Sequence, residues 1–393
     1  MMKSTGWARV WSWVVGAACW AVVITTGTAQ AQAAAHAQGA AHAPARNVVL
    51  VMTDGLRWQE LVRGADSALL TPSRYYDGRN VDALQREFLA PTPEARRRQL
   101  MPFVWGTLVP GGVLWGDRDA GSEAAVTNGF NFSYPGYSET LTGHGDPRID
   151  SNDNKPNPNV TVLEWLNQQP GLEHQAAAFG AWAVINGIVN KERCGFPVNA
   201  GWDALAMEPM TPELSLVNDW KRDSPRIWDD EPFDAPVIET ALQYVKQKHP
   251  RVLFVSLGET DDWAHGGNYG EYLLSAHRVD QYLERLWNAL QAMPQYRNNT
   301  TLIFTTDHGR GAEGDGWRSH GQKLPESKEM FIAMMGAGVA RVGVATHVAP
   351  VTQSQVAATM AKLLGRDWNA AEPKAGLPLP PVTSDAVVHA DVH

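Results

Sequence analysis

The stretch Asn47-Val48-Val49-Leu50-Val51-Met52-Thr53-Asp54-Gly55 carries the signal that decides the fold. Its unbroken run of apolar residues predicts a strand that is buried on both faces of a parallel sheet. The run stops at Asp54, so a carboxylate follows the carboxyl end of the strand. Because open α/β sheets place their functional groups at that edge, Asp54 is the first candidate site residue.

Comparable apolar runs recur along the chain and alternate with segments of helical period. The expected strands cover residues 176–183, 251–257, 301–305 and 330–335. The expected helices cover residues 160–168, 236–248, 272–293 and 353–364. Strands that alternate with helices predict a doubly wound α/β fold, in which a mostly parallel central sheet has helices on both faces.

The length and charge of the chain narrow its class and its partners. Its 393 residues are enough for one large α/β domain or two small ones. The net charge of −9, with histidines neutral, disfavours nucleic acid polymers and anionic membranes as partners. A small-molecule substrate is therefore expected, and an anionic one would need local metal ions to attract it. The sequence predicts no oligomeric state.

Residues 1–31 have the composition of a cleaved secretory signal. Lys3 and Arg9 flank the start of an apolar stretch, and Ala29-Gln30-Ala31 supplies small residues for cleavage. The alternative is a retained membrane anchor, although the stretch is short for one. Cleavage would remove two basic residues and no acid, which changes the net charge from −9 to −11. A periplasmic or secreted protein is expected, with no stable membrane span after processing.

The remaining chain divides by composition. Residues 32–45 are expected to be a flexible Ala/Gln/His linker, residues 46–366 to hold the catalytic domain, and residues 367–393 to form a Pro/Ala-rich C-terminal tail. Whether this tail docks as extended chain or is disordered stays open. Residues 64–110 and 200–235 have no recognisable motif and are expected to be rim loops that set specificity.

Two later segments place Asp and His just after apolar runs. Asp307-His308 follows one run directly, and Asp261 and His265 are spaced to lie on one side of a helical turn and bind one cation. The alternative for the second segment is an acidic loop with a capping aspartate. Asp and His that arrive from separate strand ends are the ingredients of a two-metal hydrolase.

A serine stands just before a Pro-Gly turn in the stretch Asn131-Phe132-Ser133-Tyr134-Pro135-Gly136-Tyr137-Ser138. At a helix N-terminus, Ser133 would sit where an alkoxide and a bound phosphate oxygen are least costly. The alternative is an ordinary N-cap serine. His144 and His277 are expected to be structural.

The order of these motifs resembles the alkaline phosphatase superfamily. Thr-Asp-Gly comes first, then Ser-Tyr-Pro-Gly-Tyr with Leu-Thr-Gly, Asp-x-x-x-His, Thr-Asp-His-Gly and a later His, over residues 47–338. The chain most resembles the type I phosphodiesterase/nucleotide pyrophosphatase branch and its bacterial relatives. That resemblance implies an alkaline phosphatase-like fold and two divalent metal ions, Zn²⁺ or alternatively Mn²⁺.

The resemblance also implies the roles of individual residues. One metal would be bound by Asp261, His265 and His320, and the other by Asp54, Asp307 and His308. Ser133 would be the nucleophile, in contact with the metals, and Asn154 would hold a phosphoryl oxygen, with Asn152 as the alternative. Candidate substrate contacts adjoin these positions at Tyr134, Trp263 and Arg310.

Some positions depart from the family patterns. Gly136-Tyr137 replaces the Asn-His that often follows the proline in the phosphodiesterase branch. The sulfatase pattern fits at Ser133 and Pro135, but Tyr137 occupies its Arg position, so maturation to formylglycine is not expected. The chain also has no room for the inserted domain of cofactor-independent phosphoglycerate mutases.

The sequence thus predicts an exported two-metal hydrolase of phosphate esters that works through a phosphoseryl intermediate. Two cations about 4 Å apart would clamp the attacking and leaving oxygens. Phosphodiester or nucleotide-type substrates are slightly favoured. The alternatives are a phosphomonoesterase, a phosphonate hydrolase or a sulfatase of the same superfamily, a non-catalytic protein that binds a phosphorylated ligand, and a metal-stabilised structural protein.

Overall fold

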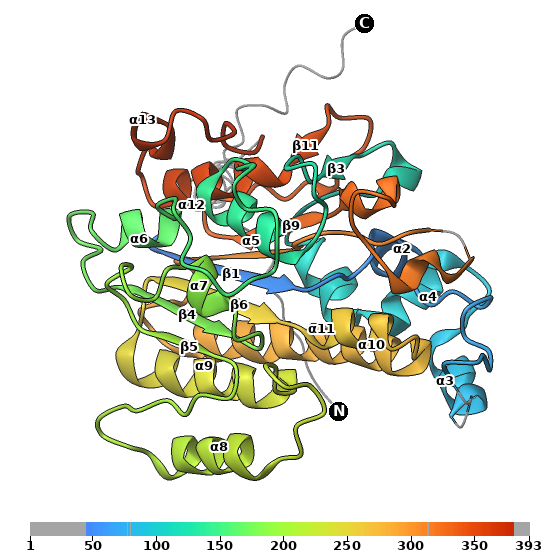
Figure 1. Cartoon of the computed structure of the whole chain (residues 1–393). Helices are drawn as coiled ribbons and strands as arrows, with labels where there is room; N and C mark the ends of the chain where they lie inside the picture. The colour runs from blue at the N-terminus through green and yellow to red at the C-terminus, as the bar shows by residue number, and fades with distance from the viewer. Residues whose placement is uncertain (1–44, 77, 79, 313, 381–393) are drawn as a thin grey trace, which may run out of the picture. The chain divides into compact units, whose positions relative to one another are not determined.

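The computed structural model describes residues 45–76, 78, 80–312 and 314–380. Its centre is an eight-stranded sheet with the strand order β10-β2-β9-β7-β1-β6-β4-β5 (Figure 1). The strands are β1 (Asn47–Thr53), β2 (Gly112–Trp115), β4 (Ala176–Gly180), β5 (Val198–Ala200), β6 (Val252–Leu257), β7 (Thr300–Thr306), β9 (Ile332–Gly336) and β10 (Gly343–Val344).

Strand β1 lies between β6 and β7 and runs parallel to both. Thr53 is level with Leu257 of β6 and with Thr306 of β7. The residues that follow these three strands therefore emerge together at one edge of the sheet. Strands β4 and β5 continue the parallel order, whereas β9 is antiparallel to β7 and to β2. The predicted α/β fold with a mostly parallel sheet is confirmed.

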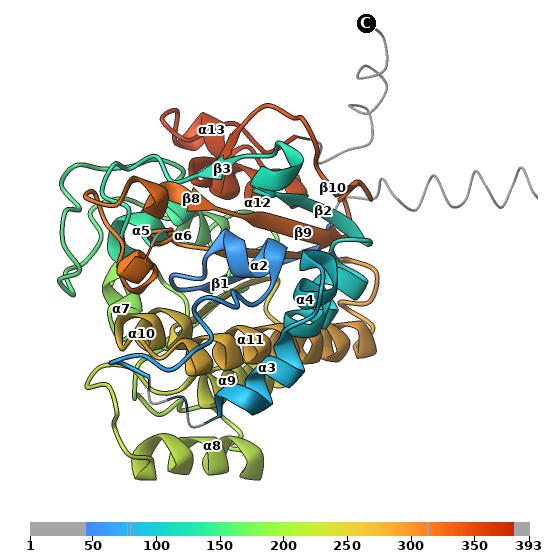
Figure 2. The ribbon, with the colours of Figure 1, turned by 90° about the vertical axis from the view of Figure 1, so that its right-hand side faces the viewer.

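Helices cover both faces of the sheet, as Figures 1 and 2 show. Val49 and Val51 of β1 belong to one apolar core, and Val48, Leu50 and Met52 belong to the other. The first face carries α2 (Trp58–Arg63), α3 (Val81–Phe88), α4 (Pro93–Leu100), η1 (Val104–Leu108), α9 (Asp234–Lys248), α10 (Glu259–His265) and α11 (Tyr269–Ala292), with α8 (Pro212–Asp223) against α9. The second face carries α5 (Ser133–Thr142), α6 (Val162–Leu166), α7 (Ile185–Ile188), α12 (Val356–Leu363) and α13 (Trp368–Ala371).

A small second sheet and several short turns complete the described structure. The sheet has the order β11-β3-β8 and comprises β3 (Ala124–Ala125), β8 (Glu329–Met330) and β11 (Val351–Thr352). The 3-10 turns are η2 (Arg118–Ala120), η3 (Gly314–Arg318), η4 (Pro325–Lys328) and η5 (Gln353–Gln355).

The predicted strands and helices all have counterparts, but the expected rim loops also contain helices. Segment 64–110 holds α3, α4 and η1, and segment 200–235 holds α8. Helix α4 reads Pro-Glu-Ala-Arg-Arg-Arg-Gln-Leu and lacks an apolar stripe, which explains why periodicity missed it. Its start did carry a local signal, because the Thr92 side chain caps Ala95 N and a proline follows directly.

The first part of the C-terminal tail is docked. Trp368 is buried, its Nε1 donates to Thr142 O at 2.9 Å, and its ring meets that of Trp165 edge-on at 5.3 Å. Leu379 is also buried, and its backbone N–H donates to Thr359 Oγ1 at 2.8 Å. The predicted signal, nearly all of the predicted linker and residues 381–393 lie outside the described residues. Among the described helices, none is long and apolar enough to cross a membrane.

Gly136 sets how closely α5 approaches the end of β7, and this gives a test of the packing. A Cβ at Gly136 would lie 2.3 Å from the carbonyl oxygen of Asp307. We expect Gly136→Ala to lower the free energy of unfolding by about 1–3 kcal/mol, measured by urea denaturation, because the backbone of α5 or β7 must shift. Gly106→Ala is the matched control, since a Cβ there meets nothing within 4 Å. Equal effects at the two positions would contradict the close approach.

Candidate active site

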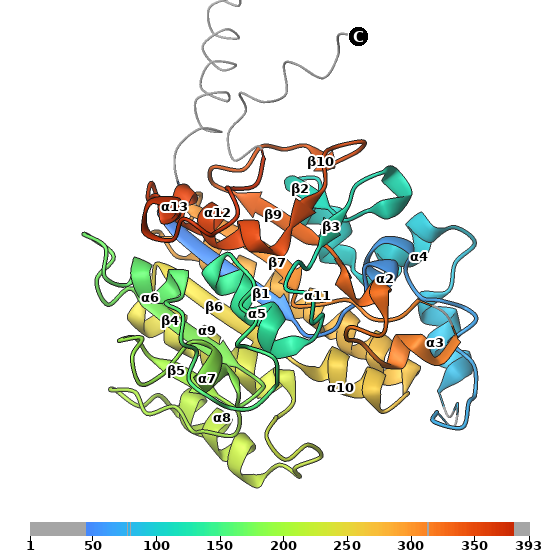
Figure 3. The ribbon, with the colours of Figure 1, turned by 45° about the horizontal axis from the view of Figure 1, so that its top comes forward.

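Helix α5 places Ser133 at the edge where β1 and β7 end. The helix begins at Ser133, after Phe132 in extended conformation. Figure 3 shows α5 beside β1. Ser133 is buried, and its Oγ lies 3.4 Å from Asp54 Oδ1 and 3.2 Å from His308 Nε2. Three segments that are far apart in the sequence thus converge on one hydroxyl.

Asp54, Asp307 and His308 form the first cluster, here called the buried group. His308 Nε2 lies 3.3 Å from Asp54 Oδ1 and 3.2 Å from Asp307 Oδ2. Gly55 N donates to Asp307 Oδ1 at 3.0 Å, whereas the buried Oδ2 has no hydrogen-bond partner among the residues that the structure describes. His308 Nδ1 lies 2.8 Å from Gly309 O, which favours a proton on Nδ1 and leaves the Nε2 lone pair facing the carboxylates.

Asp261, His265 and His320 form the second cluster, here called the rim group. Helix α10 supplies Asp261 and His265, and the chain after η3 supplies His320. His265 Nε2 lies 3.1 Å from Asp261 Oδ2 and 2.9 Å from His320 Nε2. His320 Nε2 is 3.6 Å from Asp261 Oδ1, and its ring stacks on that of His308 at 3.9 Å.

The donor atoms of the buried group could hold a divalent cation, and so could a second set in which His308 takes the place of His265 beside Asp261 and His320. Ligand atoms of Asp54, Asp307 and His308 all lie within 4.8 Å of one another, and so do those of Asp261, His308 and His320. The buried Asp307 Oδ2 and His320 Nδ1 both lack a hydrogen-bond partner within the described chain. Mixed carboxylate and imidazole donors are the ligands that Zn²⁺ and similar metals prefer.

The electrostatics of these residues also indicate a need for positive charge. Burial, and then the charge of Asp261, raises the pKa of Asp54 well above its ordinary value. Burial and the charge of Asp54 do the same to Asp307. Burial and then His308 lower the pKa of His320 to about 2, so its imidazole is neutral and able to ligate a metal.

Arg310 is the cation nearest these clusters, and the protein itself uses all three of its guanidinium nitrogens. Nε donates to Trp317 O at 2.7 Å, Nη2 donates to Arg318 O at 3.0 Å, and Nη1 contacts Asp261 Oδ1. Burial alone would raise the pKa of Asp261, but Arg310, together with the two rim histidines, holds it well below its ordinary value. Arg310, which was expected to contact substrate, therefore holds the Asp261 carboxylate in this structure.

The other two expected substrate contacts differ from each other. Tyr134 is buried, and its hydroxyl donates to Lys155 O at 2.6 Å, so it packs behind the serine instead of facing an open site. Trp263 is half-buried on α10, with its ring edge-on to Trp228 at 5.2 Å. Of the three residues, only Trp263 keeps substantial exposure beside the rim group.

The structure brings the alternative asparagine, Asn152, to the nucleophile segment. Asn152 Oδ1 accepts a hydrogen bond from Tyr134 N at 3.0 Å, next to Ser133. Asn154 is exposed, and its Oδ1 points to the backbone of Gly187, where a Cβ would meet it at 2.7 Å. Of the two asparagines, Asn152 therefore contacts the nucleophile segment and Asn154 contacts Gly187, and the phosphoryl-binding role stays a prediction for both.

The sequence analysis missed several buried residues around the site. Thr260 Oγ1 donates to the carbonyl of Asp54 and lies 2.9 Å from Thr53 Oγ1, so it joins α10 to β1. The Tyr137 hydroxyl accepts from Ser256 Oγ at 2.9 Å. Glu231 is buried near the start of α10. The partners of the first two, Thr53 and Ser256, are hydroxyl residues near the ends of β1 and β6 and could have signalled these two contacts, whereas no motif marks Glu231.

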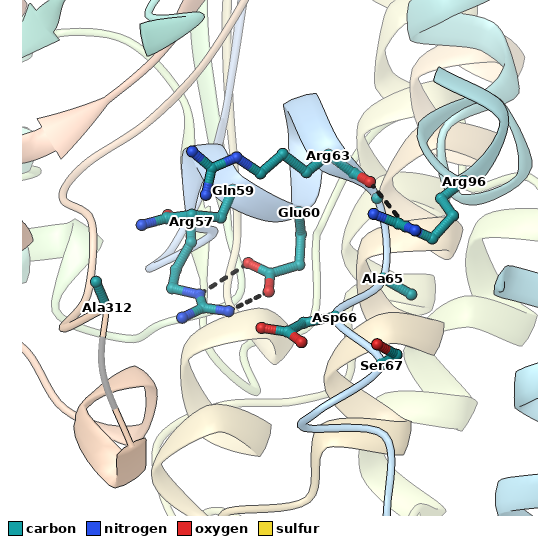
Figure 4. A pocket seen from close by; sticks show the side chains of 10 residues that line it. Arg57, Gln59, Glu60, Arg63, Ala65, Asp66, Ser67, Arg96 and Ala312 are labelled. Carbon is teal, nitrogen blue, oxygen red and sulfur yellow. Dashed lines mark hydrogen bonds and ion pairs between the residues drawn. The ribbon is translucent and has the colours of Figure 1, made fainter. Parts of the chain in front are cut away.

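A separate cavity of about 260 Å³ lies beside α2 (Figure 4). The buried Arg57 pairs with Glu60 through two hydrogen bonds, and Arg63 and Arg96 line the same cavity. Arg57 Nη1 also donates weakly to Gly311 O at 3.4 Å. Arg57 thus braces the turn after Asp54 against the chain after Arg310, and Trp58 starts α2.

Solved structures share this fold at low sequence identity. Alkaline phosphatase PafA is 11% identical with a TM-score of 0.56, and the alignment covers 86% of this chain and 98% of that one. The i-CgsB protein in complex with a neocarrahexaose is 15% identical with a TM-score of 0.51 over 85% and 75% of the chains. The lipoteichoic acid synthase LtaP of Listeria monocytogenes is 10% identical with a TM-score of 0.52 over 84% and 74%.

Sequence comparisons assign the chain to a family. A 2,3-bisphosphoglycerate-independent phosphoglycerate mutase of Gracilaria tenuistipitata var. liui is 27% identical over 81 residues, which span 21% of this chain and only 15% of that protein. The family model described as Sulfatase matches residues 46–366. These findings give no support to the expected phosphodiesterase/nucleotide pyrophosphatase branch. The chain belongs to the Sulfatase family and is a hydrolase of the alkaline phosphatase superfamily.

Proposed function

We propose that the protein is a metal-dependent hydrolase of phosphate monoesters with Ser133 as its nucleophile. The observation that carries the proposal is the position of Ser133 Oγ, which lies against Asp54 and His308 of the buried group. The same His308 also belongs to a metal-ligand set with Asp261 and His320. A hydroxyl beside two sets of metal ligands that share His308 is the arrangement expected of a two-metal phosphoryl-transfer site.

Ser133, the start of α5 and the two groups of metal ligands together account for how the phosphoryl group is bound and attacked. Cations held by the two groups would lower the pKa of the serine hydroxyl and neutralise charge on the phosphoryl group. Ser133 Oγ attacks phosphorus while the bond from phosphorus to the leaving oxygen breaks, which gives a phosphoseryl intermediate. Water then attacks phosphorus and releases Ser133 and phosphate. Because α5 begins at Ser133, the positive end of its dipole faces the oxyanion charge throughout.

In-line displacement also assigns a side to the leaving group. The attacking and leaving oxygens lie on opposite sides of phosphorus. Ser133 approaches from the buried group, so the leaving alcohol departs toward the rim group. His265 there is nearly half exposed, at 47% of its side-chain surface, which gives the alcohol access to solvent.

Charge favours a monoester over its rivals. A phosphate monoester carries up to about two negative charges near neutral pH, one more than a phosphodiester or a sulfate ester. Two divalent cations bind the more highly charged group better. The fold likeness to alkaline phosphatase PafA agrees with this choice. The phosphodiester preference drawn from the sequence rested on the branch that the comparisons do not support.

A sulfatase is the second candidate, because the matching family model bears that description. Two residues argue against it. Ser133 stands at the nucleophile position, and Tyr137, where the sulfatase pattern has Arg, is fully buried with its hydroxyl bound to Ser256. We further propose that the protein is exported, on the signal-like composition of residues 1–31.

Replacement of the nucleophile tests the reaction. We expect Ser133→Ala to lower kcat on p-nitrophenyl phosphate by about 10³-fold or more, because it removes the hydroxyl that lies against Asp54 and His308. The metal content should stay the same. Ser151→Ala, in a half-buried loop position, is the control and should keep full turnover. Parallel assays with bis-p-nitrophenyl phosphate and p-nitrophenyl sulfate rank the ester types. Full activity of Ser133→Ala would refute the proposed nucleophile.

Metal quantitation tests the two groups of ligands. We expect purified protein to hold two equivalents of Zn²⁺ or Mn²⁺, and a chelator to abolish turnover until metal is restored. Asp54→Ala and His320→Ala should each lower the content toward one equivalent. His144→Ala is the matched control, because His144 pairs with Glu372 at 3.7 Å, away from both groups. Turnover that survives complete removal of metal would exclude this chemistry.

A further inference from the structure

Two carboxyl groups next to the proposed active site have no role in the chemistry above. Glu231 lies in the loop before α9 and is only 8% exposed. Its Oε1 is buried and has no hydrogen-bond partner within the described residues. Asp262 on α10 is half-buried, and its Oδ2 is likewise buried without a partner. Two buried carboxylate oxygens that lie near each other without a hydrogen-bond donor need an explanation.

The two carboxyl groups meet at the junction of β6 and α10. Gly258 forms this junction, and a Cβ built on it would lie 1.3 Å from Glu231 Oε1, so Glu231 occupies the space that a side chain at 258 would fill. Asp262 follows Gly258 by one helical turn, and its backbone N–H donates to Gly258 O at 3.5 Å, which places it at the same junction. Asp262 directly follows Asp261 of the rim group.

Other buried acids at the same junction do have partners. Asp234 accepts from Gly258 N at 2.7 Å. Glu259 accepts from Asp234 N at 2.8 Å and pairs with Arg278 at 2.7 Å. In the described part of the chain, no Lys, Arg or His forms an ion pair with Glu231 or Asp262. The local structure thus satisfies one pair of acids and leaves the other pair facing each other.

The surrounding charge makes this pair costly. Burial, and then the charges of Asp262, Asp234 and Asp54, raise the pKa of Glu231 well above its ordinary value. Two neighbouring buried carboxylates are stable only when they share a proton or bind a cation.

We propose that Glu231 and Asp262 bind a hard divalent cation, Mg²⁺ or Ca²⁺, at a site distinct from the two groups around Ser133. The paired side chains offer only oxygen, which suits a hard cation, whereas the imidazoles of the other groups suit Zn²⁺. Mg²⁺ commonly binds through one or two carboxylates. The cation ties the loop that precedes α9 to α10 and so holds the helix that carries Asp261 and His265. This inference stands on Glu231 and Asp262 alone and does not require the Ser133 reaction.

The test separates this site from the metals of the two groups. The full-length protein is stripped with chelator, saturated with Zn²⁺, and titrated with Mg²⁺ or Ca²⁺ while elemental content and Tm are measured. We expect one further equivalent to bind and Tm to rise, because a ligand of the folded state stabilises it. Glu231→Gln and Asp262→Asn should weaken this binding by at least about 10-fold and remove most of the Tm rise, while Zn²⁺ content stays constant.

Controls make the result decisive. Asp229→Asn removes an exposed acid from the same loop and should leave the response unchanged. Without Mg²⁺ or Ca²⁺, Glu231→Gln should melt at or above the wild-type temperature, because it removes a buried charge. Should Glu231→Gln fail to fold, Asp262→Asn, at a less buried position, carries the test.

Two results would overturn the proposal. One is wild-type protein that takes up neither Mg²⁺ nor Ca²⁺ beyond its Zn²⁺, which would mean that the carboxyl groups share a proton. The other is unchanged Mg²⁺ and Ca²⁺ binding in both variants. A different measurement would refute the proposed hydrolase function, namely turnover that survives Ser133→Ala or the removal of Zn²⁺. Ser133→Ala should keep the Tm response to Mg²⁺ or Ca²⁺.

Discussion

The parallel pairing of β1 with β6 on one side and β7 on the other is the constraint on which the site depends. Thr53 is level with Leu257 and with Thr306, so Asp54, Gly258 and Asp307 each emerge one residue later at the same edge. A slip of one residue in either pairing would move these groups by about 3.3 Å along the strand and turn their side chains to the other face. The register, set by apolar residues buried on both faces, therefore sets the chemistry.

Close backbone contacts at this edge bring several acidic side chains together. The basic side chains around them are too few to neutralise their charge. A Cβ at Gly55 would meet both Arg310 and Asp261, and one at Gly136 would meet Asp307 O, so missing side chains let these segments approach. Arg310 contacts only Asp261 among the carboxylates here. Burial raises the pKa values of Asp54 and Asp307, and the basic side chain paired with both is the imidazole of His308. Bound cations are the physical complement of such a site, and the fold contributes the spacing.

The sequence alone was enough to pick out the candidate site residues that directly follow a strand. Asp54, Asp307 and His308 stand right after apolar runs, and Asp261 and His265 have helical spacing, so local pattern identified them. Asn152 and Glu231 depend instead on where irregular loops cross the sheet edge, and no local pattern encodes that path. Helix α4 was missed because it buries only Leu100 and therefore lacks an apolar stripe. The comparisons support the predicted superfamily but not the predicted branch within it.

Membership of the Sulfatase family does not by itself decide which ester is cleaved. Sulfate and phosphate esters have similar tetrahedral shapes, so discrimination must come from charge. Tyr137 offers a buried neutral hydroxyl whose partner is Ser256, and Arg310 is already held by Asp261 and two carbonyl groups. In the proposed reaction, bound cations and the start of α5 would therefore supply the positive charge that faces the phosphate or sulfate group. Attraction of this kind grows with the charge of the substrate, which favours a dianionic phosphate monoester over a monoanionic sulfate.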